Sequence, residues 1–249
     1  MQNFKILSPN KEYRTIEMSP ELEAHWRVPI NHCETILNQI NNGTYARWFE
    51  GKTDMTVIDF GANVGLTALY FMPACKELLC VEPTPSHLEL LRQLITKDIS
   101  VDFYAHLNEP LCYNAKRLGL NLKIADCALG ENVEVVTFCT GHSTENKITS
   151  EGGYGDAKIR LQSFPLSIFV NEMNGLVDFV KCDIEGFENK ALSIEELMKV
   201  KDRVKTFFVE MHPGYGLGFD EIFTELNAKF MQCGYKVERI DFQTIVATW

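Results

Sequence analysis

Along the sequence, short continuous runs of apolar residues are followed by stretches in which apolar residues recur at helical spacing. One run leads into Asp59 and a second into Glu82, and helical spacing follows at 64–72 and at 87–94. Continuous apolar runs are typical of parallel strands that are buried on both faces, whereas helices repeat their apolar positions with every turn. The pattern therefore predicts strand–helix–strand units and an α/β fold.

The same alternation continues through the middle of the chain. We expect a further helix between 97 and 121, followed by a third strand and turn over 122–130. A fourth strand, expected to be antiparallel, covers 133–138, and another strand covers 158–161. Between them lies a loop at 140–156 that is rich in Gly, Ser, Thr and Asn, a composition that is typical of ligand-covering loops.

The last part of the chain predicts the end of a sheet. Apolar runs at 176–182 and 208–212 indicate two more buried strands, and an apolar-periodic helix covers 219–231. Strand patterns at 234–240 and 243–248 are separated by a tight turn, which is the form of a terminal hairpin.

The segment before the first buried strand has a different pattern. Residues 1–52 are predicted to form a mixed helical extension on the substrate side of a domain that covers 53–249. The segment contains Trp26, Tyr45 and Trp48. Because aromatic residues that precede a core domain usually pack on it, we expect most of these side chains to do so.

A glycine turn joins the first strand to its helix. Gly61 and Gly65 follow Asp59, and glycine allows backbone to approach a ligand closely. The helix that begins there offers unpaired N–H groups to a carboxylate or phosphate. A dinucleotide fingerprint would need glycine where Asn63 and Leu66 stand, so the spacing argues against NAD.

Acidic residues end three of the predicted strands. Glu82 ends the second strand, where two acceptor oxygens suit the hydroxyls of a ribose. Asp183, Glu185 and Glu188 follow the strand at 176–182, and Glu210 lies within the strand at 208–212. The carboxyl ends of parallel strands meet at one edge of a sheet, which is where open α/β sheets bind ligands.

These motifs resemble those of FkbM-type methyltransferases, a branch of the class I enzymes that use S-adenosylmethionine (SAM). The resemblance rests on the Asp-x-Gly-Ala-Asn-x-Gly turn from Asp59 to Gly65 and on the Lys-x-Asp-x-Glu-Gly-x-Glu block from Lys181 to Glu188. It implies a Rossmann-like sheet of seven mostly parallel strands, with the last strand antiparallel and helices on both faces. It also implies SAM as the cofactor.

The resemblance assigns the cofactor site residue by residue. The glycine turn would hold the methionine end of SAM, Glu82 the ribose, and residues 126–128 the adenine. Asp183 would border the cofactor and could hold its amine. The implied cofactor-binding residues are Asp59, Gly61, Ala62, Asn63, Gly65, Glu82, Pro83, Asp126, Cys127, Ala128 and Asp183.

Methyl transfer to a hydroxyl group requires a general base within hydrogen-bond reach. The candidates at the strand ends are Asp183, Glu185, Glu210 and His212. His212 has the ordinary pKa that suits this role. The same side chains together with Glu188 offer oxygen and nitrogen donors to Mg²⁺, but acids at 185 and 188 also suit the first turn of a helix. We therefore expect no required metal.

Composition excludes several classes of protein. The 249 residues are 45% hydrophobic, which is enough for a full core. A net charge of −10 without clustered Lys and Arg argues against nucleic acid as a partner. We see neither a signal peptide nor a membrane span, and we expect a cytoplasmic location. The eight cysteines include no C-x-x-C pair, so neither a zinc site nor a disulfide framework is predicted.

Three classes of function follow from the sequence. The favoured one is O-methylation of a hydroxyl group on a small molecule, sugar or glycan, with N-methylation as a variant that the sequence does not separate. The second is a catalytically silent SAM-binding or scaffold protein. The third is a nicotinamide-dependent oxidoreductase, which the glycine spacing disfavours.

Overall fold

The computed structural model describes residues 5–9, 13–17, 25–29, 34–94, 119–140, 147–148 and 157–249. Its centre is a seven-stranded sheet in the order β13-β14-β12-β11-β4-β5-β6. The strands are β4 (Met55–Phe60), β5 (Cys75–Val81), β6 (Asn121–Ala125), β11 (Phe179–Cys182), β12 (Thr206–Glu210), β13 (Lys236–Arg239) and β14 (Thr244–Thr248).

The directions of these strands confirm the predicted fold. Strands β6, β5, β4, β11 and β12 pair in parallel. Strand β14 is antiparallel to both β12 and β13. The last two strands form the predicted terminal hairpin, and the sheet is therefore parallel except for β14.

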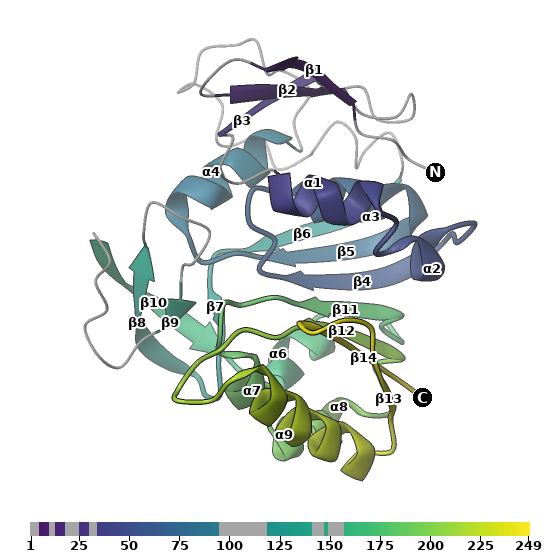
Figure 1. Ribbon diagram of the computed structural model, residues 1–249, viewed down its shortest axis with the longest axis vertical. Helices are drawn as coiled ribbons and strands as arrows, with labels where there is room; N and C mark the ends of the chain where they lie inside the picture. Colours follow the sequence, from purple (N-terminus) through teal and green to yellow (C-terminus); the bar gives the residue numbers. More distant parts are fainter. Residues whose placement is uncertain are drawn as a thin grey trace.

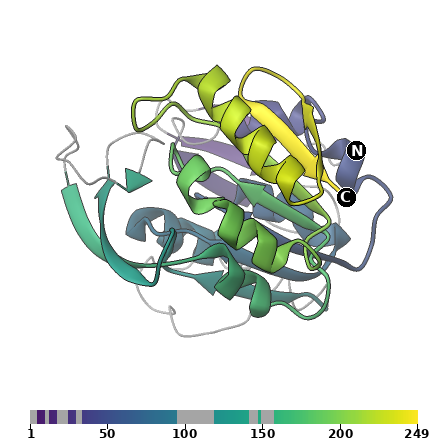
Figure 2. The ribbon, with the colours of Figure 1, turned by 90° about the horizontal axis from the view of Figure 1, so that it is seen from below.

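Helices cover both faces of the sheet (Figures 1 and 2). On one face lie α1 (Glu34–Asn41), α3 (Leu66–Phe71) and α4 (Pro85–Leu94). On the other face lie α6 (Leu166–Asn171), α7 (Glu188–Ala191), α8 (Ile194–Val200) and α9 (Phe219–Gln232). Two short helices, α2 (Ala46–Phe49) and the 3-10 helix η2 (Met72–Ala74), complete the layer that contains α1. The helices expected at 64–72, 87–94 and 219–231 correspond to α3, α4 and α9.

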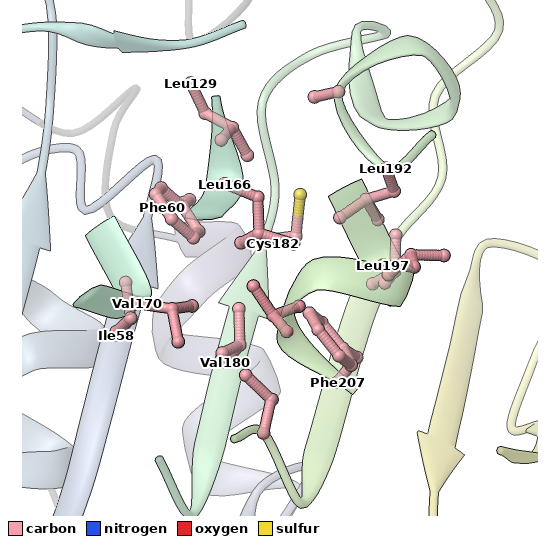
Figure 3. Packing of buried hydrophobic residues seen from close by; sticks show 14 of the residues in the cluster. Ile58, Phe60, Leu129, Leu166, Val170, Val180, Cys182, Leu192, Leu197 and Phe207 are labelled. Carbon is pink, nitrogen blue, oxygen red and sulfur yellow. The ribbon is translucent and has the colours of Figure 1, made fainter. Parts of the chain in front are cut away.

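The central strands bury side chains on both faces, which explains their continuous apolar sequence. On one face Ile58, Val180 and Phe207 pack with Leu166 of α6 and Leu197 of α8 (Figure 3). The residues one position away point to the other face, where they meet α1, α2 and α3. The central strands are therefore packed against helices on both faces of the sheet.

A second, smaller sheet lies at the edge toward which β4 and β5 run (Figure 1). Its order is β7-β10-β8-β9. The strands are β7 (Ala128–Leu129), β8 (Glu134–Thr140), β9 (Lys147–Ile148) and β10 (Ala157–Phe164). Strand β8 is antiparallel to β10, as expected for the strands at 133–138 and 158–161.

The prediction that residues 1–52 are helical was wrong for the first part of the segment. Residues 5–29 contain the antiparallel strands β1 (Lys5–Pro9), β2 (Tyr13–Glu17) and β3 (His25–Pro29). Helix begins only at Glu34. Polar and apolar residues alternate over His25–Pro29, which is a strand pattern, and two of the three short runs end at a proline.

The aromatic residues of α2 and the turn before it pack on the domain, as predicted. Tyr45 is fully buried and meets Phe71 edge to face, and Phe49 stacks on Phe71 at 4.4 Å. Trp48 contacts Phe208. The boundary between an extension and a domain at residue 52 stays a prediction.

Two expected features lie mainly outside the described residues. These are the helix at 97–121, of which only the last three positions are described, and the loop at 140–156, of which the described part is Thr140 and β9.

Candidate active site

A cleft opens at the carboxyl ends of the parallel strands. Its walls come from the ends of β4, β5 and β11 and from the small sheet. The lining residues are Phe60, Gly61, Asn63, Val81, Glu82, Pro83, Thr84, His87, Ala128, Leu129, Phe138, Asp183, Ile184, Glu185 and Phe187. The edge is the one at which open α/β sheets bind ligands.

The glycine turn after β4 forms the floor of the cleft. The N–H groups of Gly61 and Ala62 both donate to the carbonyl of Val81. Gly61 has a φ of +73°, and a Cβ atom there would lie 1.8 Å from the backbone oxygen of Asp183. No side chain fits in that space. Glycine is therefore required both by the backbone conformation and by the approach of the chain after β11.

The other residues of the turn have different surroundings. Asn63, with a φ of 50°, lines the cleft. Ala62 is buried in the core beneath it, and Gly65 faces α4, where an added Cβ would lie 2.6 Å from Leu91 Cδ1. Of the implied cofactor residues in this turn, Gly61 and Asn63 border the cleft, while Ala62 and Gly65 shape its backbone.

Asp59 lies below the turn and is not among the residues that line the cleft. Its carboxylate is fully buried, accepts a 2.6 Å hydrogen bond from the Thr67 hydroxyl, and lies 3.3 Å from the Lys181 ammonium. Burial raises the pKa of Asp59, and Lys181 opposes that rise. The carboxylate thus fastens the strand end to the first turn of α3.

Glu82 presents an oriented carboxylate to the cleft. Its side chain is 5% exposed, and each oxygen accepts one backbone hydrogen bond, Oε2 from Asn63 at 2.9 Å and Oε1 from Thr84 at 2.8 Å. His87 Nδ1 lies 3.5 Å from Oε1. Both oxygens keep acceptor capacity for a ribose diol, so the geometry fits the role that the sequence assigned to Glu82.

The residues expected beside the adenine are only partly brought together. Of residues 126–128, Ala128 lines the cleft, as does Pro83 of the wider set of implied cofactor residues. The Asp126 side chain is 73% exposed and lies 3.8 Å from the Arg92 guanidinium, and Cys127 belongs to the hydrophobic core. Four further lining residues were not predicted from the sequence: the apolar walls Phe60, Leu129 and Phe138, and His87 of α4.

A buried acid holds the turn that follows β11. The Glu188 side chain is 1% exposed and accepts hydrogen bonds from the N–H groups of Ile184 and Gly186. It also pairs with His212 Nδ1 at 2.9 Å. Glu185, in the middle of the turn, has a φ of 59°, which is uncommon for a residue other than glycine. Glu188 therefore fixes the position of both Glu185 and His212.

His212 and Glu185 face each other. His212 Nε2 lies 3.7 Å from Glu185 Oε2 and 3.8 Å from Asp183 Oδ1. Burial alone would lower the pKa of His212, but the hydrogen bond to Glu188 and the surrounding carboxylates raise it to about 10. The ordinary pKa of histidine, on which the prediction of His212 as a base rested, therefore does not apply here. In this environment His212 is an imidazolium at neutral pH and has no free lone pair to accept a proton.

The two glutamates titrate near neutrality. Burial, reinforced by Asp183, raises the pKa of Glu185 to about 8 and that of Glu210 to about 7. Glu185 lines the cleft, whereas the Glu210 carboxylate accepts a hydrogen bond from Gln39 of α1 and is not among the lining residues. A general base works best with a pKa near the operating pH, and Glu185 combines that pKa with access to the cleft.

Metal-ligand atoms also gather here. Donor atoms of Asp183, Glu188 and His212 lie within 4.8 Å of one another. The Glu188 oxygens already accept backbone hydrogen bonds, and the Lys181 ammonium lies 3.1 Å from Asp183. A nearby ammonium disfavours a dication.

We therefore predict that removal of divalent cations with EDTA leaves SAM affinity and methyl transfer unchanged. Both are measured before and after adding Mg²⁺ or Mn²⁺ back. A loss with EDTA that the cation restores would show that a metal is required.

Comparison with known protein families matches the FkbM methyltransferase domain over residues 59–237. The chain belongs to the FkbM methyltransferase family. It is a SAM-dependent methyltransferase, which decides against the nicotinamide alternative. The match includes both the glycine turn and the acidic block after β11.

Solved structures of other proteins are also similar to that of the FkbM methyltransferase. Fibrillarin, a pre-rRNA processing protein of Methanococcus jannaschii, has 12% identity and a TM-score of 0.49, with 100% of this chain and 99% of that chain covered. Magnesium protoporphyrin IX methyltransferase of Synechocystis PCC 6803, solved with bound SAM, has 10% identity and a TM-score of 0.43, with 85% and 81% covered. No curated protein matches the chain. Within the described residues, no helix is both long and apolar enough to cross a membrane.

Proposed function

We propose that the FkbM methyltransferase transfers the methyl group of SAM to a hydroxyl group of a small molecule, sugar or glycan, with Glu185 as the general base. The observation that carries this proposal is the position of Glu185. It is a largely buried carboxylate, with a pKa of about 8, that lines the cleft at the strand ends.

The residues of the cleft fit SAM. Gly61 leaves room at the floor, the Glu82 carboxylate is aimed at a ribose position, and Phe60, Leu129 and Phe138 offer apolar walls. When bound, SAM supplies a methyl group that its sulfonium already activates, so the protein contributes mainly by positioning the acceptor.

The second task of the protein is to remove the hydroxyl proton. Glu185 can accept it only when ionised, so transfer should become faster as the pH rises through about 8. The His212 imidazolium stabilises the ionised carboxylate and keeps the pKa of Glu185 from rising further. Glu188 holds the imidazolium in place.

We predict that His212→Ala binds SAM normally but transfers the methyl group about tenfold more slowly at neutral pH. Without the imidazolium the pKa of Glu185 rises, because the charge that lowers it is gone. The pH–rate profile should therefore move to higher pH. Glu185→Gln is the comparison variant, since it should slow transfer by about 10²-fold or more and remove the rise with pH. An unchanged rate and profile in His212→Ala would exclude this role.

The acceptor is found by a screen. The protein is incubated with SAM labelled in the methyl group and with neutral sugars, glycans, phenols and amines. A net charge of −10 disfavours polyanionic acceptors, so neutral hydroxyl compounds are expected to be methylated. Methylation of amines alone would favour the N-acceptor variant. SAM binding without transfer to any acceptor would favour the silent scaffold.

We also propose a cytoplasmic location for the protein.

A further inference from the structure

Lys181 has no role in the mechanism above, although it is the one buried lysine or arginine among the residues that the structure describes. Its side chain is 2% exposed. It stands on β11 and pairs in register with Asp59 of β4. Burying an ammonium group has a high desolvation cost. The groups around the Lys181 ammonium must therefore compensate for that cost.

The contacts of Lys181 join two parts of the site. Its Nζ atom donates to the Gly61 carbonyl at 3.2 Å and lies 3.3 Å from Asp59 Oδ1, both in or beside the glycine turn. The same atom lies 3.1 Å from Asp183 Oδ2, in the turn after β11. Burial would lower the pKa of Lys181, but Asp183 and Asp59 outweigh it and raise the pKa well above its usual value. The ammonium therefore stays charged.

We propose that Lys181 is a positioning residue that fixes the Asp183 carboxylate relative to the cofactor turn. This proposal rests on the proposed function and on the place that the resemblance gives to Asp183, beside the SAM cofactor. Asp183 is at the surface of the cleft, while Asp59 is below the floor. Because the Lys181 ammonium pairs with both carboxylates, it holds the turn after β4 and the turn after β11 at a constant distance from each other.

Stability alone is a weak explanation for this arrangement. A buried ion pair can often be replaced by apolar residues of similar size without loss of stability. What such a replacement would not supply is a fixed direction for the Asp183 carboxylate. Replacement of Lys181 should therefore disturb the arrangement of the site more than it lowers the stability of the fold.

The test compares Lys181→Met with the wild type by hydrogen exchange of the unliganded protein. The amides of Gly61 and Ala62 donate to Val81, and that of Asp183 donates to Phe60, so their protection reports on both turns. We expect faster exchange at these amides in Lys181→Met. Lys199→Met, which removes an exposed lysine on α8, is the control and should exchange like the wild type.

The second readout is the affinity for S-adenosylhomocysteine, which is what SAM becomes after it has lost its methyl group. Calorimetry measures this affinity. Lys181→Met should weaken binding about tenfold. In an Asp183→Asn background the same change should weaken it less than about threefold, because Lys181 acts through Asp183. Equal affinity of Lys181→Met and wild type, or a full effect in the Asp183→Asn background, would overturn the proposal.

One further variant separates positioning from folding. Lys181→Met leaves the Asp59 carboxylate buried without its cation, whereas the double variant Lys181→Met/Asp59→Asn removes both charges. The double variant should unfold at about the wild-type temperature and still show fast exchange at Asp183. Wild-type exchange at Asp183 in this variant would contradict the proposal. If the wild type bound no S-adenosylhomocysteine, the proposed function would fail, and the exchange data would still decide the role of Lys181.

Discussion

Gly61→Val is expected to abolish SAM binding. A Cβ atom at this position would lie 1.8 Å from the backbone oxygen of Asp183, and the backbone has a φ of +73°. The valine can be accommodated only if the turn after β4 moves away from the turn after β11. Both turns line the cleft, so the cofactor site is lost along with some stability. Calorimetric titration with SAM and S-adenosylhomocysteine should give no measurable heat of binding.

Gly51→Val is the matched control for this prediction. Gly51 has a φ of +68°, but nothing lies within 4 Å of its missing Cβ. A side chain there costs about 1–2 kcal/mol of left-handed backbone strain, without a collision. Gly51→Val should therefore lose a little stability and bind SAM normally. Normal SAM binding by Gly61→Val, or equal loss of binding in the two variants, would refute the assignment of the turn.

Glu82→Gln is expected to weaken the binding of S-adenosylhomocysteine about a hundredfold. Each carboxylate oxygen of Glu82 accepts a backbone N–H, from Asn63 and from Thr84. In either orientation of a glutamine, its amide nitrogen would face one of these donors. The side chain would turn away, and the ribose hydroxyls would lose an acceptor. Calorimetry measures the affinity, and thermal unfolding measures the accompanying loss of stability.

Strand β5, which ends one residue before Glu82, provides a control for the stability part of this effect. Glu77 of β5 is also buried and accepts hydrogen bonds from Asn121 and Asn174, but it does not line the cleft. Glu77→Gln should lower the unfolding temperature and leave the affinity unchanged. If both variants lost affinity in proportion to stability, Glu82 would have only a structural role.

The sequence predicted the elements whose signals are local. The apolar runs before Asp59 and Glu82 became β4 and β5, because strands buried on both faces need apolar residues at every position. The glycine turn was recognisable since Gly61 must be glycine for a local reason, its backbone conformation. Its second reason, the approach of Asp183, depends on a residue far along the chain.

The features that the sequence did not reveal depend on pairing between distant segments. Phe138 and Leu129 reach the cleft only because β8, β10 and β7 form a small sheet beside it. The resemblance placed Asp59 among the cofactor-binding residues, but its carboxylate accepts a hydrogen bond from Thr67 of α3 and does not line the cleft. The pKa of His212 followed from three carboxylates that the fold brings around it.

The measurement that tests the account most directly is a calorimetric titration of the wild type with SAM, S-adenosylhomocysteine and NAD. We expect micromolar binding of the first two, about −8 kcal/mol, and no binding of NAD. That result would establish the cleft as a SAM site and justify the acceptor screen. Binding of NAD without binding of SAM would contradict the account.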